Sequence, residues 1–240
     1  MPVAVLSDIH GNFEALERVL EVCDDRSLVE VLCLGDVVGY GADPGACVDL
    51  VFDKAALTCA GNHDWAASGR IDTSNFNTMA AAAITWTQAE LSEHQTQYLD
   101  ALPLEYHRDD AHFVHGSPHD PSAFHYIFGA SEAASALTQS SAALTFVGHS
   151  HRAFVYDDSE GEVVSREGTT QIAAGHRVLV NVGSVGQPRD GDPRAAFCVW
   201  DIECGALELI RVPYDVSVTQ EKILDNGLPE FLAHRLSAGR

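Results

Sequence analysis

Short apolar runs that end in polar residues recur along the first half of the chain. Residues 3–6 are all apolar, and they lead within a few residues to Asp8 and His10. The run predicts a buried parallel strand, because strands covered on both faces read as continuous apolar segments. Apolar residues at helical spacing follow over 13–22, so Asp8 and His10 are expected between a strand and a helix. Open α/β sheets bind their ligands at that place.

The same arrangement occurs at two further segments. Residues 30–34 and 55–60 predict short strands, and the first is followed by Asp36 and the second by Asn62 and His63. Polar residues with metal-ligating groups at three neighbouring strand ends would make a poor core. We therefore expect these side chains to form one site.

Helical segments lie between and after these strands. A helix is expected over 44–52, with Asp43 as its N-cap and a proline at its first position. Two more helices, 74–90 and 92–102, belong to an insertion at 65–102. This insertion either packs on a face of the domain or caps it, and we favour packing with a partial cap role. Other helices are expected at 131–138, at 216–226 and, unless that segment is a tail, within 229–240.

The second half of the chain has mostly strand character. A hairpin is expected at 104–107 and 111–114, and it leads directly to His115. Because nothing marks a linker, we expect one domain over 1–240, of the α/β class, in which two sheets carry helices on their outer faces. The remaining strands are expected at 144–147, 153–156, 162–166, 171–173, 177–182, 195–201 and 207–212.

The charge of the chain limits its partners. With 35 acidic and 14 basic residues the net charge is −21, which disfavours nonspecific binding to nucleic acid or to an anionic membrane. A phosphate ester would also be repelled unless bound divalent cations reverse the sign locally. A surface adapted to high salt is an equally good explanation of the charge.

Targeting and redox features indicate a cytoplasmic location. No apolar run is long enough to span a bilayer, and the N-terminus has neither the basic region nor the cleavage site of a signal peptide. The six cysteines form no C-x-x-C pair and lie mostly in apolar segments, so buried reduced thiols are expected.

Eight residues with metal-ligating side chains stand at the predicted strand ends. Carboxylates, a carboxamide and imidazoles without a thiolate suit Mn²⁺, Fe or Zn²⁺ and argue against a structural zinc site. The set is too large for one ion, whereas two ions that share a carboxylate fit it, as in sites for in-line displacement at phosphorus. The eight are Asp8, His10, Asp36, Asn62, His63, His115, His149 and His151.

These residues lie in five short motifs in a fixed order. The chain reads D-x-H-G-N at 8–12, G-D-x-x-G-Y-G at 35–41, G-N-H-D at 61–64, H-G-S at 115–117 and G-H-S-H at 148–151. The set resembles the calcineurin-like metallophosphoesterases, and within them the small prokaryotic phosphodiesterase branch related to diadenosine tetraphosphatases. The resemblance runs from residue 3 to about residue 200 and includes the glycine-punctuated loop at 181–195.

The resemblance implies a fold, a metal centre and a reaction. The fold is a four-layer α-β-β-α sandwich with two mixed β-sheets flanked by helices. The activity is that of a two-metal-dependent phosphoesterase, in which a metal-bridging hydroxide attacks phosphodiesters or dinucleoside polyphosphates. Manganese is the expected metal, with iron, zinc, nickel or cobalt as alternatives. The ligands implied are Asp8, His10 and His151 for one ion, Asn62, His115 and His149 for the other, and Asp36 as the bridge.

Further roles are implied for the residues around the metals. His63 is the expected catalytic residue, which stabilises the transferring phosphoryl group or protonates the leaving oxygen. Asp64 either orients His63 or caps a helix. His149 and His151 are expected in extended chain, where residues two apart point the same way.

Substrate contacts are less defined. Arg152, Arg189 and Arg194 could each hold a phosphate through two hydrogen bonds, or they could pair with Asp190 and Asp192. Asn12 is assigned to substrate contact or, as the alternative, to capping the first helix. The loop at 181–189 either supports the site from behind or contacts substrate. Aromatic residues in 119–130 either join the core, which we favour, or stack on a base.

Other activities remain open beside the leading one. The substrate is expected to be a small phosphoester or nucleotide, and an oligomer is compatible with the sequence. A phosphomonoesterase, including a protein phosphatase, is the main alternative. A non-catalytic metal-binding scaffold would be expected to have lost ligands, and nuclease activity is disfavoured by the charge.

Overall fold

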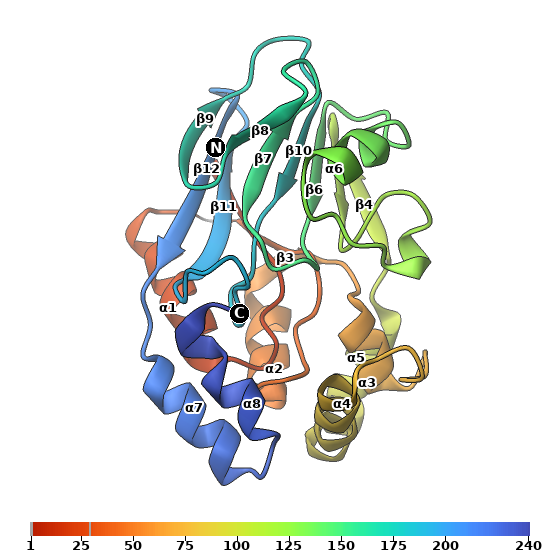
Figure 1. The fold of residues 1–240 in the computed structure, drawn as a ribbon, viewed down its shortest axis with the longest axis vertical. Coiled ribbons are helices and arrows are strands. Elements are labelled where there is room, and N and C mark those ends of the chain that lie inside the picture. The colour runs from red at the N-terminus through yellow and green to blue at the C-terminus, as the bar shows by residue number, and fades with distance from the viewer. Residues whose placement is uncertain (1, 29) are drawn as a thin grey trace.

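Two mixed sheets pack face to face in the computed structural model, which describes residues 2–28 and 30–240. The strand order is β3-β2-β1-β11-β12-β9 in the first sheet and β4-β5-β6-β10-β7-β8 in the second. Helices cover the outer faces, with α1 and α6 on opposite sides of the pair (Figure 1). The predicted four-layer α-β-β-α architecture is confirmed.

The first sheet is built around β1 (Pro2–Leu6). This strand runs parallel to β2 (Val31–Cys33), which runs parallel to β3 (Ala55–Thr58). Because these three strands share a direction, the loops that follow them leave the same edge of the sheet. The antiparallel side consists of β11 (Ala195–Asp201), β12 (Ala206–Val212) and β9 (Gly168–Gln171).

The second sheet has its own parallel core, in which β6 (Leu144–Val147) lies between β5 (Ala111–Val114) and β10 (Val178–Asn181). Alternation along each strand decides which side chains meet. Val3 and Val5 of β1 face the second sheet and its Phe113 and Phe146, whereas Ala4 and Leu6 face the helices. The other strands are β4 (Glu105–Arg108), β7 (Phe154–Asp157) and β8 (Glu162–Ser165).

The helices agree with the sequence pattern, with two differences. The segment Asn62–Ser68, which was not predicted to be helical, forms α3. The helix expected from residue 74 begins at Thr78, because the Asn77 side chain accepts the Ala80 N–H at 3.0 Å and caps it. The remaining helices are α1 (Phe13–Asp25), α2 (Pro44–Lys54), α4 (Thr78–Glu90), α5 (Glu93–Ala101), α6 (Ala130–Leu137), α7 (Val216–Asp225) and α8 (Glu230–His234), with short 3-10 turns η1 (Pro121–Ala123) and η2 (Leu236–Ala238).

Three smaller expectations have clear outcomes. Asp43 stands at the N-cap of α2, but its carboxylate accepts from Lys222 at 2.8 Å and makes no capping bond. Five cysteines are buried free thiols, and Cys204 is exposed. The strand expected at 171–173 lies at Gly168–Gln171 instead. Within the described residues, no helix has the length and apolar character needed to cross a membrane.

Candidate active site

The predicted strand-end side chains come together from both sheets. Asp8 and His10 follow β1, Asp36 follows β2, His115 follows β5, and His149 with His151 follows β6; Asn62 and His63 begin α3. All of these except Asn62 are buried. The site therefore lies where the parallel cores of the two sheets end.

The backbone around the site is unusual. Asp8, His10, Asp36, His149 and His151 all have positive φ, between 52° and 63°. This left-handed conformation costs roughly 1–2 kcal/mol for a residue other than glycine, and such strain gathers at functional sites. The expectation of extended chain at His149 and His151 is wrong, since each turns in the left-handed region.

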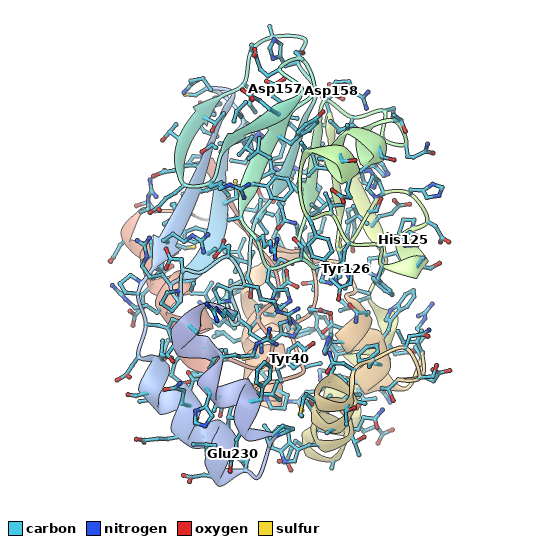
Figure 2. The ribbon with its side chains drawn as sticks, viewed as in Figure 1. Tyr40, His125, Tyr126, Asp157, Asp158 and Glu230 are labelled. Carbon is cyan, nitrogen blue, oxygen red and sulfur yellow. The ribbon has the colours of Figure 1, made fainter. Side chains whose placement is uncertain are left out.

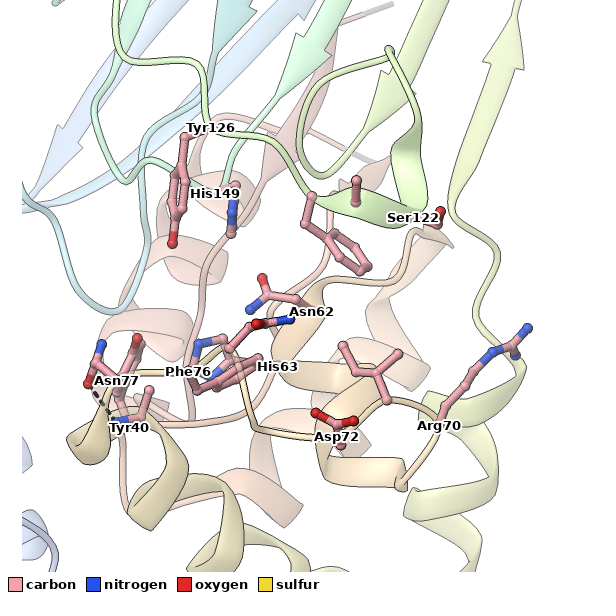
Figure 3. Close-up of a pocket in the computed structure, with 15 residues that line it drawn as sticks. Tyr40, Asn62, His63, Arg70, Asp72, Phe76, Asn77, Ser122, Tyr126 and His149 are labelled. Atoms are coloured by element: carbon pink, nitrogen blue, oxygen red, sulfur yellow. Dashed lines mark hydrogen bonds between the residues drawn. The ribbon is translucent and has the colours of Figure 1, made fainter.

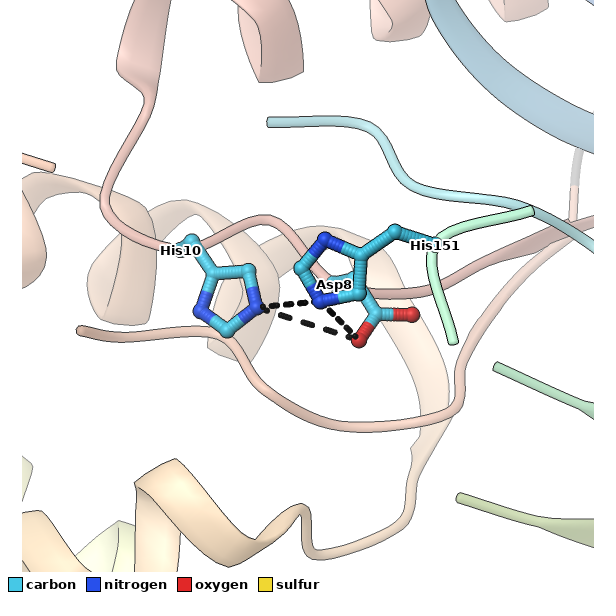
Figure 4. Close-up of side chains that lie close together, drawn as sticks. All are labelled: Asp8, His10 and His151. Atoms are coloured by element: carbon cyan, nitrogen blue, oxygen red, sulfur yellow. Dashed lines mark hydrogen bonds and ion pairs between the residues drawn. The ribbon is translucent and has the colours of Figure 1, made fainter. Parts of the chain in front are cut away.

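One group consists of Asp8, His10 and His151 (Figure 4). The His10 and His151 Nε2 atoms lie 3.1 Å apart, and Asp8 Oδ1 is 3.3 Å from His151 Nε2. Each Nδ1 faces a carbonyl, His10 that of Val38 at 3.0 Å and His151 that of Gln187 at 2.6 Å. Because a carbonyl only accepts, each Nδ1 carries the proton and the two Nε2 lone pairs face each other. Two lone pairs at that distance repel, so the pair is arranged for a cation.

The other group consists of Asp36, His115 and His149. His115 Nε2 lies 3.1 Å from His149 Nδ1 and 3.3 Å from Asp36 Oδ2, and its Nδ1 donates to the Leu34 carbonyl. Burial opposes ionisation here, but Asp36 and Asp8 raise the pKa of His115 to about 9. The facing imidazoles in turn hold the pKa of Asp36 well below its usual range, although burial alone would raise it.

Asp36 connects the two groups. Its Oδ2 lies 3.3 Å from His115 Nε2 and 3.6 Å from His10 Nε2, while its Oδ1 accepts the His63 N–H at 2.9 Å. One carboxylate oxygen thus faces ring nitrogens of both groups. This is the place expected for a bridging ligand.

Atoms without partners support a metal centre at the same place. Within residues 2–28 and 30–240, Asp8 Oδ1 and Asn62 Oδ1 are buried and have no hydrogen-bond partner. Buried polar atoms are normally bonded, so such exceptions need an explanation. Carboxylate, amide and imidazole acceptors are the ligands that first-row divalent cations take in sites without thiolates. The residues therefore fit a pair of such cations.

Asp64 caps the loop that carries Asp36. Its Oδ2 accepts N–H groups from Asp36 at 2.7 Å and Gly61 at 2.9 Å, and its Oδ1 accepts those of Val37 and Val38. Among the residues that the structure describes, the carboxylate makes no bond to His63. Of the two roles left open for Asp64, capping is thus confirmed.

The loop at 181–189 supports the site from behind. Ser184 Oγ and the Gly186 N–H both donate to the Asp8 carbonyl, at 2.8 and 2.9 Å. The Gln187 carbonyl orients His151. Asn12 is part of the same support: its Oδ1 caps α1 through the Ala15 N–H, and its Nδ2 donates to the Gly186 carbonyl at 2.8 Å. The capping role of Asn12 is confirmed, and its amide is fully engaged by the protein.

Comparisons with known proteins agree with this geometry. Residues 1–205 match the profile of the calcineurin-like phosphoesterase superfamily domain. The chain belongs to this superfamily. It is 39% identical over 242 residues to an uncharacterized protein of Methanocaldococcus jannaschii, a match that covers 99% of this chain and 98% of the relative.

The chain is also similar to proteins whose structures have been solved. The phosphoesterase is similar to the crystal structure of a metallophosphoesterase from Sphaerobacter thermophilus, with 38% identity, a TM-score of 0.90 and coverage of 100% of this chain and 99% of the other. A hypothetical protein from Pyrococcus horikoshii OT3 shares the fold at 21% identity and a TM-score of 0.80, over 100% and 98% of the chains. The chain is accordingly a metal-dependent phosphoester hydrolase by family.

A cavity of about 770 Å³ opens in front of the metal-ligating groups of the phosphoesterase (Figure 3). Its floor is formed by Asn62, His63 and His149, one wall by the insertion, and the facing wall by the loop that contains Tyr126. Figure 2 shows Tyr40 and Tyr126 near the middle of the molecule, where the sheets end. The insertion residues on the wall are Arg70, Ile71, Asp72, Asn75, Phe76, Asn77 and Ala80.

The aromatic residues of the loop differ in role. Phe124 is buried and packs edge-on against Trp65, so the favoured core interpretation is correct for Phe124. It is wrong for Tyr126 and Phe128, each 46% exposed. Tyr126 stacks between Phe128 and His149, with centroid distances of 5.1 and 3.8 Å.

Two arginine side chains lie near the cavity. The Arg189 guanidinium donates to Gln187 Oε1 and lies 5.5 Å from the Tyr40 ring centre, and the exposed Arg152 lies 5.4 Å from that of Phe128. Within the described part of the chain neither guanidinium is paired with a carboxylate. Arg194, by contrast, is paired with Asp192 at 2.5 Å.

Proposed function

We propose that this phosphoesterase hydrolyses phosphodiesters or dinucleoside polyphosphates at a centre of two divalent cations. The observation that carries the proposal is the single Asp36 oxygen placed between two groups of converging imidazoles. One ion would be held by Asp8, His10 and His151, the other by Asn62, His115 and His149, with Asp36 shared. We propose manganese as the metal, with iron, zinc, nickel and cobalt as alternatives.

When bound, such cations would supply Lewis acidity and would lower the pKa of water at the site, which is the chemistry that hydrolysis of a phosphoester needs. The protein contributes fixed ligand geometry. Backbone carbonyls of Val38, Leu34 and Gln187 hold the imidazole tautomers, so each ligating nitrogen keeps its lone pair toward the centre. The site is thus arranged before substrate arrives, which favours electrostatic catalysis.

His63 is the proposed catalytic side chain outside the ligand set. Its ring lines the cavity and lies between Tyr40 and Phe76, with centroid distances of 4.5 and 5.0 Å. Burial lowers the pKa of His63 to about 4, so the imidazole is neutral at pH 7. A neutral imidazole can donate its N–H to a phosphoryl oxygen, and it gains basicity when a dianionic transition state lies beside it.

The cavity walls support an organic ester as substrate. Tyr126 and Phe128, each 46% exposed, offer aromatic surface next to His149, and nucleobases stack on aromatic rings. Arg189 and Arg152 offer unpaired guanidinium groups for phosphate oxygens. We also propose that the wall formed by the insertion acts as a partial cap.

The central experiment compares two variants in Mn²⁺. His63→Ala should retain bound metal, because His63 is not in the ligand set, while turnover of bis-p-nitrophenyl phosphate falls by about 10²-fold or more. His234→Ala, at the exposed end of α8, is the control and should behave as the wild type. Full activity in His63→Ala would remove this residue from the mechanism.

The substrate class is tested on the wild type. Rates on the diester should exceed those on p-nitrophenyl phosphate and on phosphopeptides. A preference for the monoester would instead identify a phosphomonoesterase. Hydrolysis of none of these esters by metal-replete protein would point to a scaffold.

A further inference from the structure

A second group of metal-ligating side chains lies on the hairpin β4–β5, outside the active site. β4 is the edge strand of the second sheet, and the register places His107 directly opposite His112. Glu105 is two residues before His107 on the same strand, so both side chains project from one face of the sheet. Glu105 and His107 are exposed, whereas His112 is buried.

The three side chains already converge. His112 Nε2 lies 2.7 Å from Glu105 Oε2, and the His107 and His112 rings stack with centroids 4.0 Å apart. One ligand atom from each residue falls within 4.8 Å of the other two. The arrangement brings two imidazoles and one carboxylate to a single point.

The buried histidine is held in place by the layer beneath it. His112 Nδ1 lies 3.3 Å from Ser140 Oγ, and this hydroxyl also accepts from Thr145 Oγ1 at 3.1 Å. Because a carboxylate only accepts, the Nε2–H of the neutral ring donates to Glu105 and Nδ1 accepts from the Ser140 hydroxyl. With a cation at Nε2, the ring would carry its proton on Nδ1 and donate it to Ser140 Oγ. Hydrogen bonds of this kind to the non-ligating nitrogen fix and strengthen metal-binding histidines.

We propose that Glu105, His107 and His112 form a second, independent binding site for a zinc-like divalent cation. Two imidazole nitrogens and one carboxylate oxygen are a ligand set that zinc takes with water in the fourth position. The cation would replace the proton that His112 Nε2 now shares with Glu105. His112 needs no movement, because the two exposed side chains can rotate to close the remaining distance.

Such a cation would tie the edge strand to its neighbour. It bridges β4 and β5, and β5 ends immediately before His115, a residue of the active site. A cation that binds the folded hairpin and not the unfolded chain would stabilise the fold by mass action. Neutral imidazoles do not repel a cation. The net charge of −21 of the chain attracts cations to its surface.

The site is tested by locating zinc directly in the full-length protein. Crystals soaked in zinc chloride should show an anomalous peak between His107 and His112 in addition to the active-site peaks. His107→Ala should abolish the hairpin peak alone. His94→Ala, an exposed histidine on α5, is the matched control and should leave every peak in place.

Equilibrium dialysis gives the same test in solution. At saturating zinc, His107→Ala and Glu105→Gln should each bind one ion fewer per chain than the wild type and keep their active-site metals. Both positions are exposed, so the variants are expected to fold. The proposal is overturned if no peak appears on the hairpin, if the peak persists in His107→Ala, or if the two variants bind as many ions as the wild type.

Discussion

Asp64 is predicted to hold the Asp36 loop rather than to assist His63, and the substitution Asp64→Asn tests this. The buried carboxylate accepts two N–H groups on each oxygen, from Gly61 and Asp36 on one and from Val37 and Val38 on the other. Asparagine keeps the shape but replaces one oxygen with an NH₂ donor. Whichever way the amide turns, two buried N–H groups lose their acceptor.

The size of the effect follows from these bonds. Each buried donor left without a partner costs about 1–3 kcal/mol, so Asp64→Asn should lower the free energy of unfolding by roughly 2–6 kcal/mol. Domains are stable by about 5–15 kcal/mol, so the variant should fold but with a clear loss. Because the Asp36 backbone is displaced, Mn²⁺ affinity should fall by about 10–100-fold, as for other supporting residues of metal sites.

Urea unfolding and Mn²⁺ titration measure the two quantities separately. Asp53→Asn provides the matched control, because the same substitution is made at a carboxylate that is 75% exposed at the end of α2. It should change neither quantity. Suppose instead that Asp64→Asn kept the wild-type urea midpoint and Mn²⁺ affinity but lost turnover. Asp64 would then act through His63, and its role as the support of the Asp36 loop would be refuted.

Three further predictions concern the same site. A Cβ at Gly61 would lie 2.0 Å from Asp36 Oδ1, so Gly61→Ala should lower metal content and melting temperature together, and unchanged metal content would contradict this. Tyr126→Leu should raise KM for a nucleotide diester by about tenfold, since stacking contributes about 1–3 kcal/mol per base, with no such rise for a diester lacking aromatic groups. Although burial opposes it, neighbouring carboxylates raise the pKa of His115 to about 9, so without metal its stabilising contribution is complete below pH 6.5 and is lost as pH rises through 9. The increase in melting temperature on adding Mn²⁺ should therefore grow between pH 7 and pH 9, and a constant increase would count against this reasoning.

The pattern of apolar runs followed by polar residues predicted the strand ends well, because this pattern involves only residues that are near one another in the sequence. Apolar runs define β1 and β2, and the polar residues that follow them stand out against those runs. The helix α3 was missed for a related reason. Its first turn contains Asn62 and His63, and its N-cap is Gly61, which offers no side-chain capping bond. Such a segment resembles a loop until the packing around it is known.

The sequence by itself determined the fold class, the order of the strand-end residues and the chemical nature of the metal ligands. These follow from periodicity and residue type, which are properties of the chain taken a few residues at a time. Only the tertiary structure decided what each polar group bonds to, as Asp64 shows by serving backbone donors instead of His63. The cluster of Glu105, His107 and His112 was likewise invisible in the sequence, because it arises from strand register across a hairpin. Hydrogen bonds and charges act over a few ångströms in space, and the folded chain alone sets those distances.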